Sequence, residues 1–244
     1  MVKALLPVVA EGIAAEACTK AEMEPIEVSL VLPCLNEEQA IGECIRKALD
    51  AFDRCGLRGE VLVADNGSTD RSVEIAMSFD DRVRVVRQEI RGYGAACRKG
   101  FSRARGRYIV MGDADNTYDF GQLVRFLTPL RDGYDMVVGN RFAGRIHPKA
   151  MPWLHRYVGT PVLSAFMNLL YRTGIRDSQC GMRAFTREAL AAMDLQCTGM
   201  ELATEMIVKA SRAGLHMCEI PIDYYPRSGQ SKLRSFRDGW RHLR

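Results

Sequence analysis

The 244-residue sequence lacks the motifs that identify several common classes of enzyme. It has no G-x-x-x-x-G-K-[ST] phosphate-binding loop, no H-E-x-x-H zinc motif and no G-x-S-x-G nucleophile turn, and its four histidines are scattered. These absences argue against a P-loop site, a catalytic zinc site and a serine hydrolase. The net charge of +4 is too small to indicate a nucleic-acid partner.

Long apolar runs and paired cysteines are also missing. No uninterrupted apolar stretch reaches the roughly 18 residues that a bilayer-spanning helix needs. The eight cysteines form no C-x-x-C pair and most have apolar neighbours, so we expect reduced thiols in a cytoplasmic protein. Glu11 and Glu16 interrupt the mildly apolar residues 1–25, which favours a loosely ordered N-terminal extension over a signal peptide.

Residues 26–226, by contrast, alternate between β-branched apolar runs and amphipathic stretches. Strands are expected at 26–33, 60–65, 82–88, 107–112 and 134–140, with helices between them at about 36–54, 70–78, 94–104 and 119–131. This alternation predicts an α/β fold built on a parallel sheet. A long helix at about 158–173, a helix that contains Glu201 and Glu205, and a strand-like segment at 216–226 complete a single domain.

Three of the expected strands end in polar segments. These are "PCLNEE" (33–38), "DNGSTD" (65–70) and "DADNTYD" (113–119). Ligands of parallel α/β sheets bind beyond the carboxyl ends of the strands, so we expect the three segments to converge on one edge.

Asp113 and Asp115 are the most informative pair in these segments. In extended geometry, residues two apart project from the same face, and two carboxylates suit a hard divalent cation that also binds phosphate oxygens. The alternative is an Asp-rich turn that caps the following helix. Asp119 is better explained as that cap.

Asp65 and Asn66 close the second expected strand. A carboxylate here could accept the imide N–H of a pyrimidine or a ribose hydroxyl, although an Asn-Gly turn explains the segment equally well. The nearby "RGYGAACRKG" (91–100) is not a dinucleotide fingerprint, because Cys97 replaces the third glycine and the segment follows the third strand.

Basic residues gather in the second half of the chain. Arg141, Arg156, Arg227 and Lys232 are candidates for phosphate contacts, because guanidinium and ammonium groups suit them; the alternative for each is a solvated surface charge. Residues 227–244 hold six Lys/Arg and Trp240, which fits either an anionic membrane surface or a frayed basic helix. Glu201 and Glu205 share a helical face, which is either solvated or lines the cleft.

In order along the chain, "VLPCLNEE", "VADNGSTD", "RGYGAACRKG", "DADNTYD", "GNRF", "DSQCGMRAF" and "PRSGQSKL" resemble the motifs of a family 2 glycosyltransferase. More narrowly, the chain resembles the polyprenyl-phosphate glycosyltransferases, the dolichyl-phosphate mannose and glucose synthase group. The resemblance covers about residues 26–244. It implies the GT-A fold, a Rossmann-like three-layer sandwich with a mostly parallel central sheet.

The resemblance also implies roles for individual residues. The nucleotide pocket would be lined by Pro33, Asn36, Glu37, Asp65, Asn66 and Ala114. Asp113 and Asp115 would hold Mg²⁺ or Mn²⁺, Arg141 and Arg156 would grip an acceptor phosphate, and Arg227 and Lys232 would close over the donor phosphates. Asn66 departs from the family, which often has a second Asp there. Asn116, Thr117 and Tyr118 occupy the region where relatives often have a Gln, which leaves a third metal ligand open.

The resemblance predicts metal-dependent, inverting transfer of a hexose from a UDP- or GDP-sugar to a polyprenyl phosphate. Many relatives carry C-terminal membrane helices, whereas this chain stops in the basic stretch where they would begin. The chain is then either truncated before such helices or a natural peripheral form, and we expect a peripheral protein at the cytoplasmic face of a membrane. Two alternatives stay open: a transferase with a small soluble acceptor, and a non-catalytic nucleotide-sugar-binding module.

Overall fold

A computed structural model describes residues 25–229 of the chain. Almost all of the expected N-terminal extension, Lys232, Trp240 and most of the basic C-terminal segment lie outside the described residues. Among residues 25–229, no helix is both long and apolar enough to cross a membrane.

The described strands form one seven-stranded sheet in the order β3-β2-β1-β4-β6-β5-β7. The strands are β1 (Val28–Cys34), β2 (Gly59–Asp65), β3 (Val83–Arg87), β4 (Tyr108–Met111), β5 (Met136–Asn140), β6 (Arg183–Thr186) and β7 (Met217–Pro221). All neighbours pair in parallel except β6, which is antiparallel to both β4 and β5. The predicted mostly parallel sheet is confirmed, while β6 was not predicted as a strand.

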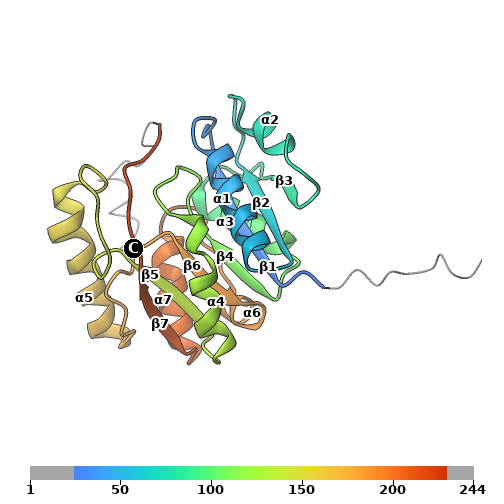
Figure 1. The fold of residues 1–244 in the computed structure, drawn as a ribbon. Helices are drawn as coiled ribbons and strands as arrows, with labels where there is room; N and C mark the ends of the chain where they lie inside the picture. Colours follow the sequence, from blue (N-terminus) through green and yellow to red (C-terminus); the bar gives the residue numbers. More distant parts are fainter. Residues whose placement is uncertain (1–24, 230–244) are drawn as a thin grey trace, which may run out of the picture.

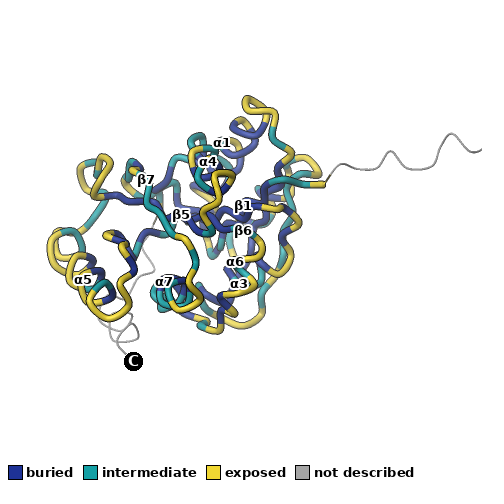
Figure 2. Tube along the Cα trace, turned by 90° about the horizontal axis from the view of Figure 1, so that it is seen from below, coloured by how far each residue is buried: buried dark blue, intermediate teal, exposed yellow. Residues whose placement is uncertain are grey.

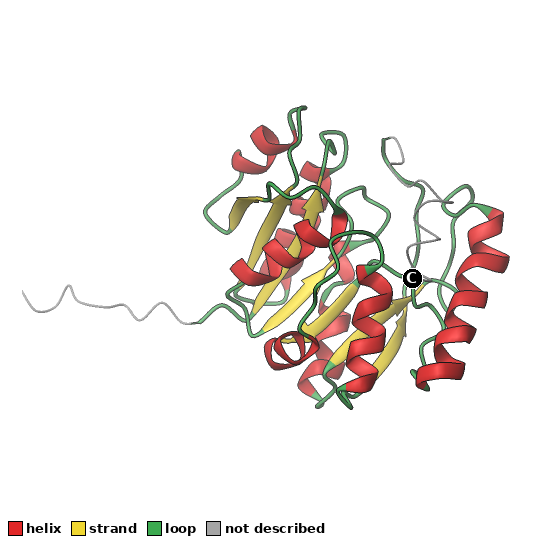
Figure 3. Cartoon of the chain, turned by 180° about the vertical axis from the view of Figure 1, so that it is seen from behind, coloured by secondary structure: helices red, strands yellow, loops and turns green. Residues whose placement is uncertain are grey.

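Helices cover both faces of the sheet and complete three layers (Figures 1 and 3). One layer contains α1 (Ile41–Arg54) and α4 (Val124–Arg131), with the short α2 (Ser72–Met77) beside α1. The other contains α3 (Tyr93–Arg103), α6 (Arg187–Met193) and α7 (Leu202–Arg212). Strands covered on both faces are mostly apolar, and β2 and β5 are buried along their whole length.

Two of the predicted helices differ from the expectation in detail. The helix expected at 119–131 is divided into a 3₁₀ turn, η1 (Phe120–Gln122), and α4. Asp119 caps η1 by accepting a hydrogen bond from the Gly121 N–H at 3.0 Å, which confirms the predicted cap. The long helix expected at 158–173 consists of a π-helical turn, η2 (His155–Gly159), followed by α5 (Thr160–Tyr171), which lies outside the sandwich at the side of β7.

Candidate active site

The candidate site lies where the order of the strands changes direction. From β1 the chain moves outward to β2 and β3, and then returns to place β4 on the other side of β1. The carboxyl ends of β1, β2 and β4 therefore meet at one edge, where parallel α/β sheets bind their ligands. The structure thus brings the three polar segments that follow these strands together.

Asp113 follows β4 and faces two other segments of the chain. The Tyr93 hydroxyl at the start of α3 donates to Asp113 Oδ1 at 2.9 Å. Asp113 Oδ2 lies against Gly181, where an added Cβ would be only 2.5 Å from this oxygen. Burial raises the pKa of Asp113 well above its usual range, and the negative charge of Asp115 raises it further.

Asp115 is held in a turn rather than in extended chain, because β4 ends at Met111. Its Oδ1 accepts hydrogen bonds from the Thr117 N–H at 3.1 Å and the Thr117 hydroxyl at 2.6 Å. Its Oδ2 forms an ion pair with Arg227 Nη1 at 3.3 Å. Strand alternation, on which the sequence argument relied, is therefore not the reason why Asp113 and Asp115 are close.

Arg227 connects two of the polar segments. Besides Asp115, its guanidinium binds Glu37 Oε1 after β1, and both carboxylates are nearly buried. The chain just before and after Arg227 runs along the Asp115 turn, since the Tyr225 and Ser228 N–H groups donate to the carbonyls of Thr117 and Asp115, both at 3.0 Å. Arg227 is thus placed beside the acid pair.

The ends of β1 and β2 are tied together by side chains of the predicted nucleotide pocket. Asn36, which adopts a left-handed φ of 52°, accepts from the Thr69 N–H at 2.7 Å. Asp65 accepts from the Gly67 and Ser68 N–H groups at 3.2 and 2.9 Å. Pro33, half-buried, lies within β1 one residue before its end.

Asn66 uses its whole side-chain amide within the protein. Nδ2 donates to the carbonyls of Gln88 and Ile90 at 3.0 and 2.8 Å, and Oδ1 accepts from the Gly92 N–H at 2.8 Å. A carboxylate has no N–H and could not make the two donated bonds. This network explains in physical terms why an Asn stands at this position, and it makes Asn66 a brace of the loop before α3.

Arg141, at the end of β5, forms a buried bidentate ion pair that the sequence argument missed. Its Nε and Nη2 donate to Asp177 Oδ2 and Oδ1 at 2.8 and 2.7 Å, and its guanidinium lies over the ring of Tyr224 at 5.0 Å. Burial alone would lower the pKa of Arg141, but the carboxylate of Asp177 outweighs it and the pKa is raised. Arg141 also lies close enough to Asp113 to lower the pKa of that carboxyl.

Arg156, Glu205 of α7 and Glu201, which directly precedes α7, have partners of their own. Arg156 sits in η2 with its guanidinium 5.3 Å from the ring centre of Tyr157. Glu205 accepts from the Gln196 and Cys197 N–H groups and pairs with Lys209. Glu201 accepts from the Gly199 N–H at 3.0 Å.

The acid pair has the chemistry of a divalent cation site. The two neighbouring carboxylates repel each other, which is part of why the pKa of Asp113 is raised, and a cation would relieve that repulsion. Among the described residues, no group of three or more His, Cys, Asp and Glu side chains is arranged to hold a metal. Asn116 does not join the acid pair as a third ligand, since its Oδ1 accepts a hydrogen bond from Lys47 Nζ at 2.9 Å. The pair fits a hard cation whose other ligands are phosphates and waters.

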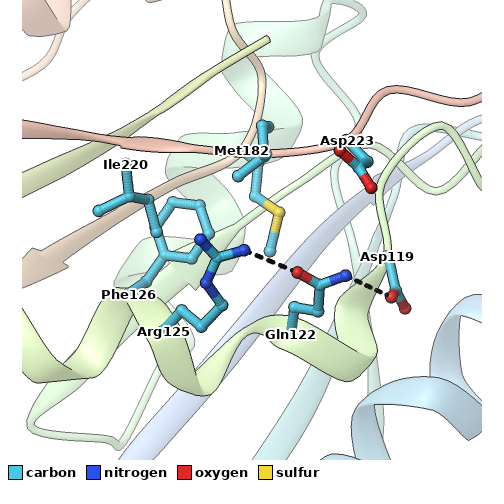
Figure 4. A pocket seen from close by; sticks show the side chains of 8 residues that line it. Asp119, Gln122, Arg125, Phe126, Met182, Ile220 and Asp223 are labelled. Atoms are coloured by element: carbon cyan, nitrogen blue, oxygen red, sulfur yellow. Dashed lines mark hydrogen bonds between the residues drawn. The ribbon is translucent and has the colours of Figure 1, made fainter. Parts of the chain in front are cut away.

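A small pocket on the α4 side of the sheet is separate from this cluster (Figure 4). It is lined by Asp119, Gln122, Arg125, Phe126, Met182, Ile220, Ile222 and Asp223. Gln122 donates to Asp119 at 3.0 Å and accepts from Arg125 at 2.8 Å, so these polar residues of the pocket bind one another. With a volume of about 10 Å³, it has room for no more than a water molecule.

Tyr93 and Asp177 are the main site residues that sequence reasoning did not find. Both lie in segments that had been singled out, "RGYGAACRKG" and "DSQCGMRAF". Tyr93 lies between two glycines of the segment that was rejected as a dinucleotide fingerprint. Asp177 is far from Arg141 in the sequence, so no local pattern indicates that the two residues pair. Tyr93 meets Asp113 because α3 begins beside the end of β4, and Asp177 meets Arg141 because the segment before β6 lies beside the end of β5.

Comparison with known proteins decides the family. Residues 29–193 match the family described as glycosyl transferase family 2. The chain belongs to this family. The prediction of a family 2 glycosyltransferase with the GT-A fold is thereby confirmed.

Several curated relatives are similar to this family 2 glycosyltransferase. The low-salt glycan biosynthesis hexosyltransferase Agl6 of Haloferax volcanii is 47% identical over 218 residues, which cover 89% of this chain and 52% of that protein. The chain therefore spans about half the length of this relative. The dolichyl-phosphate hexose transferase of the same organism is 34% identical over 214 residues, which cover 87% of this chain and 89% of that protein.

Solved structures share the fold of this family 2 glycosyltransferase. Glucosyl-3-phosphoglycerate synthase from Mycobacterium tuberculosis, in complex with Mn²⁺, UDP and its product, has a TM-score of 0.68 at 21% identity, covering 89% of this chain and 77% of that chain. Mannosyl-3-phosphoglycerate synthase from Rubrobacter xylanophilus also has a TM-score of 0.68, at 22% identity, covering 89% and 70%.

Proposed function

We propose that this glycosyltransferase moves a hexose from a UDP- or GDP-sugar to a polyprenyl phosphate, with inversion at the anomeric carbon and with Mg²⁺ or Mn²⁺ on the donor diphosphate. The proposal rests on one arrangement. An acid pair, the half-buried Asp113 and the buried Asp115, has Arg227 paired with Asp115 at 3.3 Å, and the positive charge of Arg141 is among the charges that act on Asp113. Carboxylates with nearby arginines suit a cation-bound diphosphate that meets a second phosphate.

On the donor side, the pocket at the ends of β1 and β2 would hold the nucleotide. Pro33, Asn36, Glu37, Asp65, Asn66 and Ala114 remain the proposed lining. Asp113 and Asp115 would hold the cation, which when bound would neutralise charge on the departing diphosphate. Arg227 neutralises Glu37 and Asp115, and it would exchange these carboxylates for the donor phosphates, to which Lys232 is proposed as a second cation.

On the acceptor side, Arg141 would grip the lipid phosphate. Asp177 takes up Nε and Nη2 of its guanidinium, which fixes the plane of the group and leaves Nη1 outside the ion pair. Arg156 is proposed to guide the phosphate toward Arg141 from the neighbouring segment. The dolichyl-phosphate hexose transferase, 34% identical over most of its length, supports a lipid-phosphate acceptor.

The residues suit a single displacement. An acceptor phosphate oxygen would attack the anomeric carbon, the bond from that carbon to the diphosphate oxygen would break, and the nucleoside diphosphate would leave with the electron pair. A phosphate oxygen is already anionic near neutral pH, so no general base is needed. Catalysis would then come from the orientation of the two phosphates and from charge stabilisation.

One matrix of assays tests the proposal. The full chain, treated with a chelator, is offered labelled UDP- and GDP-hexoses with polyprenyl phosphate, with and without added Mn²⁺ or Mg²⁺. We expect labelled lipid only when a cation is present, and we expect it to disappear in Asp113→Ala but not in Asp132→Ala, a matched change at an exposed Asp.

The same matrix separates the alternatives. Transfer to 3-phosphoglycerate or another water-soluble acceptor, with none to polyprenyl phosphate, would support a soluble-acceptor transferase. Binding of a donor in calorimetry, without transfer to any acceptor and without hydrolysis, would support a nucleotide-sugar-binding module.

A further inference from the structure

Glu219 of β7 is bonded to both sides of the Arg141–Asp177 ion pair. Its Oε1 accepts hydrogen bonds from the Arg176 and Asp177 N–H groups, both at 2.8 Å, and its Oε2 accepts one from Asn140 Nδ2 at 2.9 Å. Asp177 supplies the carboxylate that binds Arg141, and Asn140 directly precedes Arg141 in the chain. One half-buried carboxylate therefore ties the end of β5 to the segment before β6.

The register of the two strands explains why Glu219 reaches Asn140. β7 is the edge strand of the sheet and lies half-buried beside the fully buried β5 (Figure 2). Val138 of β5 lies opposite Glu219, and Asn140, two residues further along, projects from the same face. The Asn140 amide is also fixed, because its Oδ1 accepts from the Ala143 N–H at 2.9 Å. Its NH₂ group therefore points to Glu219, which must offer acceptors to two separate groups of donors.

Glu219 can direct Arg141 without touching its guanidinium. Asp177 fixes the plane of that guanidinium through two hydrogen bonds, at 2.8 and 2.7 Å. The direction of the Asp177 carboxylate depends in turn on its backbone, which Glu219 holds. We propose that Glu219 is a positioning residue for the acceptor phosphate, because it places Asp177 and thereby aims Arg141. This inference rests on the proposed function, which assigns the acceptor phosphate to Arg141.

The effect of Glu219 should end before the donor side of the site. Arg183, which is buried, donates to the carbonyls of Ser178 and Cys180 at 2.7 and 2.9 Å. These bonds anchor the chain between the part that Glu219 holds and the glycine that lies against Asp113. Loss of the Glu219 contacts should therefore impair use of the acceptor and leave donor binding intact.

Glu219→Gln removes this support with little change of shape. A glutamine keeps one acceptor oxygen, so its NH₂ group must face either the NH₂ group of Asn140 or the N–H groups of Arg176 and Asp177. In both orientations donors face donors, and at least one hydrogen bond of the carboxylate is lost.

The kinetic effect should fall on the acceptor alone. We expect Glu219→Gln to lower kcat/KM for a short, water-soluble prenyl phosphate by about 10–100-fold, since a displacement of about 1 Å at a reacting centre costs up to about 100-fold. The Kd for UDP or GDP with Mn²⁺, measured by calorimetry, should match that of wild type. A general loss of folding would instead weaken both, and circular dichroism at the assay temperature checks for it.

Glu27→Gln is the matched control for these measurements. Glu27 is also half-buried, and it pairs with Arg131 just before the amino end of β1. This variant should match wild type with both donor and acceptor. An unchanged kcat/KM for the acceptor in Glu219→Gln, or an equal loss of donor affinity, would overturn the proposal.

A second substitution tests the geometry directly. In the double variant Asn140→Asp/Glu219→Gln, the carboxylate and the amide exchange places and the net charge is unchanged. The new carboxylate can accept from the new amide and from the Ala143 N–H, while the amide oxygen accepts from the Arg176 and Asp177 N–H groups. We expect the double variant to regain most of the kcat/KM that Glu219→Gln loses. A double variant no more active than Glu219→Gln would contradict the proposed geometry.

Hydrogen exchange, measured by NMR, tests the inference without any substrate. The Arg176 and Asp177 N–H groups lose their acceptor in Glu219→Ala and should exchange about tenfold faster than in wild type. The Gly181 N–H, which donates to the Tyr118 hydroxyl at 2.8 Å, should exchange as in wild type. Equal exchange of the first two groups in variant and wild type would show that Glu219 does not hold this backbone.

The outcomes separate this inference from the proposed function. If wild type transfers hexose to 3-phosphoglycerate and to no prenyl phosphate, the proposed acceptor is wrong. A kcat/KM for 3-phosphoglycerate that falls by about 10–100-fold in Glu219→Gln then leaves the positioning role standing. If wild type and Glu219→Gln glycosylate prenyl phosphate equally well, only the positioning role fails. Transfer to neither acceptor overturns both.

Discussion

Arg141 and Asp177 form a buried, two-pronged ion pair, with Nε to Oδ2 at 2.8 Å and Nη2 to Oδ1 at 2.7 Å. Asp177 is fully buried, and its Oδ2 also accepts from the Arg141 N–H at 2.9 Å. The guanidinium that we assign to the acceptor phosphate is thus held by a partner from the segment next to α5. Arg141 is positioned before any ligand arrives.

Removing the charge of Asp177 should therefore destabilise the protein strongly. In Asp177→Asn, Arg141 becomes a buried charge without its carboxylate, which typically costs about 3–5 kcal/mol. Urea unfolding measures this loss of stability. Glu74→Gln, which breaks the exposed ion pair of Glu74 with Arg71, is the control and should unfold like wild type. A wild-type unfolding curve for Asp177→Asn would contradict a structural role for the pair.

Arg227→Ala should weaken donor binding. The change removes the cation that we assign to the donor phosphates, and a charge-assisted contact contributes about 1.5–3 kcal/mol, so the Kd for the nucleoside diphosphate should rise by at least about tenfold. Calorimetry with UDP or GDP and Mn²⁺ measures it. Arg125→Ala, at an exposed arginine of the small pocket, should bind as wild type does. An unchanged Kd in Arg227→Ala would remove Arg227 from the donor site.

Gly181→Ala should impair the reaction with little effect on the fold. The new methyl group would stand 2.5 Å from Asp113 Oδ2 and 3.1 Å from the Tyr118 hydroxyl, so Asp113 must move. A displacement of about 1 Å at a reacting centre can lower the rate about 100-fold. We expect kcat/KM to fall by this order. Gly42→Ala, whose methyl group meets only the side chain of Ile75, is the control.

Asn66→Asp should destabilise the loop before α3, and the loss should depend on pH. The carboxylate would face the carbonyls of Gln88 and Ile90 without a proton to donate, at a cost of about 1–3 kcal/mol. These carbonyls raise the pKa of the new carboxyl in the folded state, so the penalty is full at neutral pH. It should shrink as pH falls through this raised pKa and be smallest by about pH 4, the ordinary pKa of an Asp, below which the carboxyl is protonated in both states. Unfolding curves at pH 7 and pH 4 test this sign.

The sequence predicted the parts of the fold that depend on local pattern. Apolar runs such as Val61–Ala64 and the cap at Asp119 indicated strands and a helix start because their causes lie within a few residues. The antiparallel β6 was missed because its four residues, which include the buried Arg183, show no strand pattern. The 158–173 helix was expected, but local sequence does not show which of its faces turns outward.

The same difference between local and distant causes applies to the residues of the candidate site. The acid pair was predicted because Asp113 and Asp115 follow the fourth expected strand of a sheet that offers two other polar strand ends. The partners of these residues come from distant segments, as with Tyr93 on Asp113 and Asp177 on Arg141, and only the strand order brings them together. Asn66 appeared as a departure from the family, and its three hydrogen bonds give that departure a structural cause.

The most direct test of the central claim measures transfer of labelled hexose to polyprenyl phosphate by chelator-treated wild type, before and after addition of Mn²⁺. The account predicts labelled lipid only after the metal is added, and none at any metal concentration with Asp113→Ala or Asp115→Ala. Full transfer without a divalent cation, or by either of these variants, would contradict it.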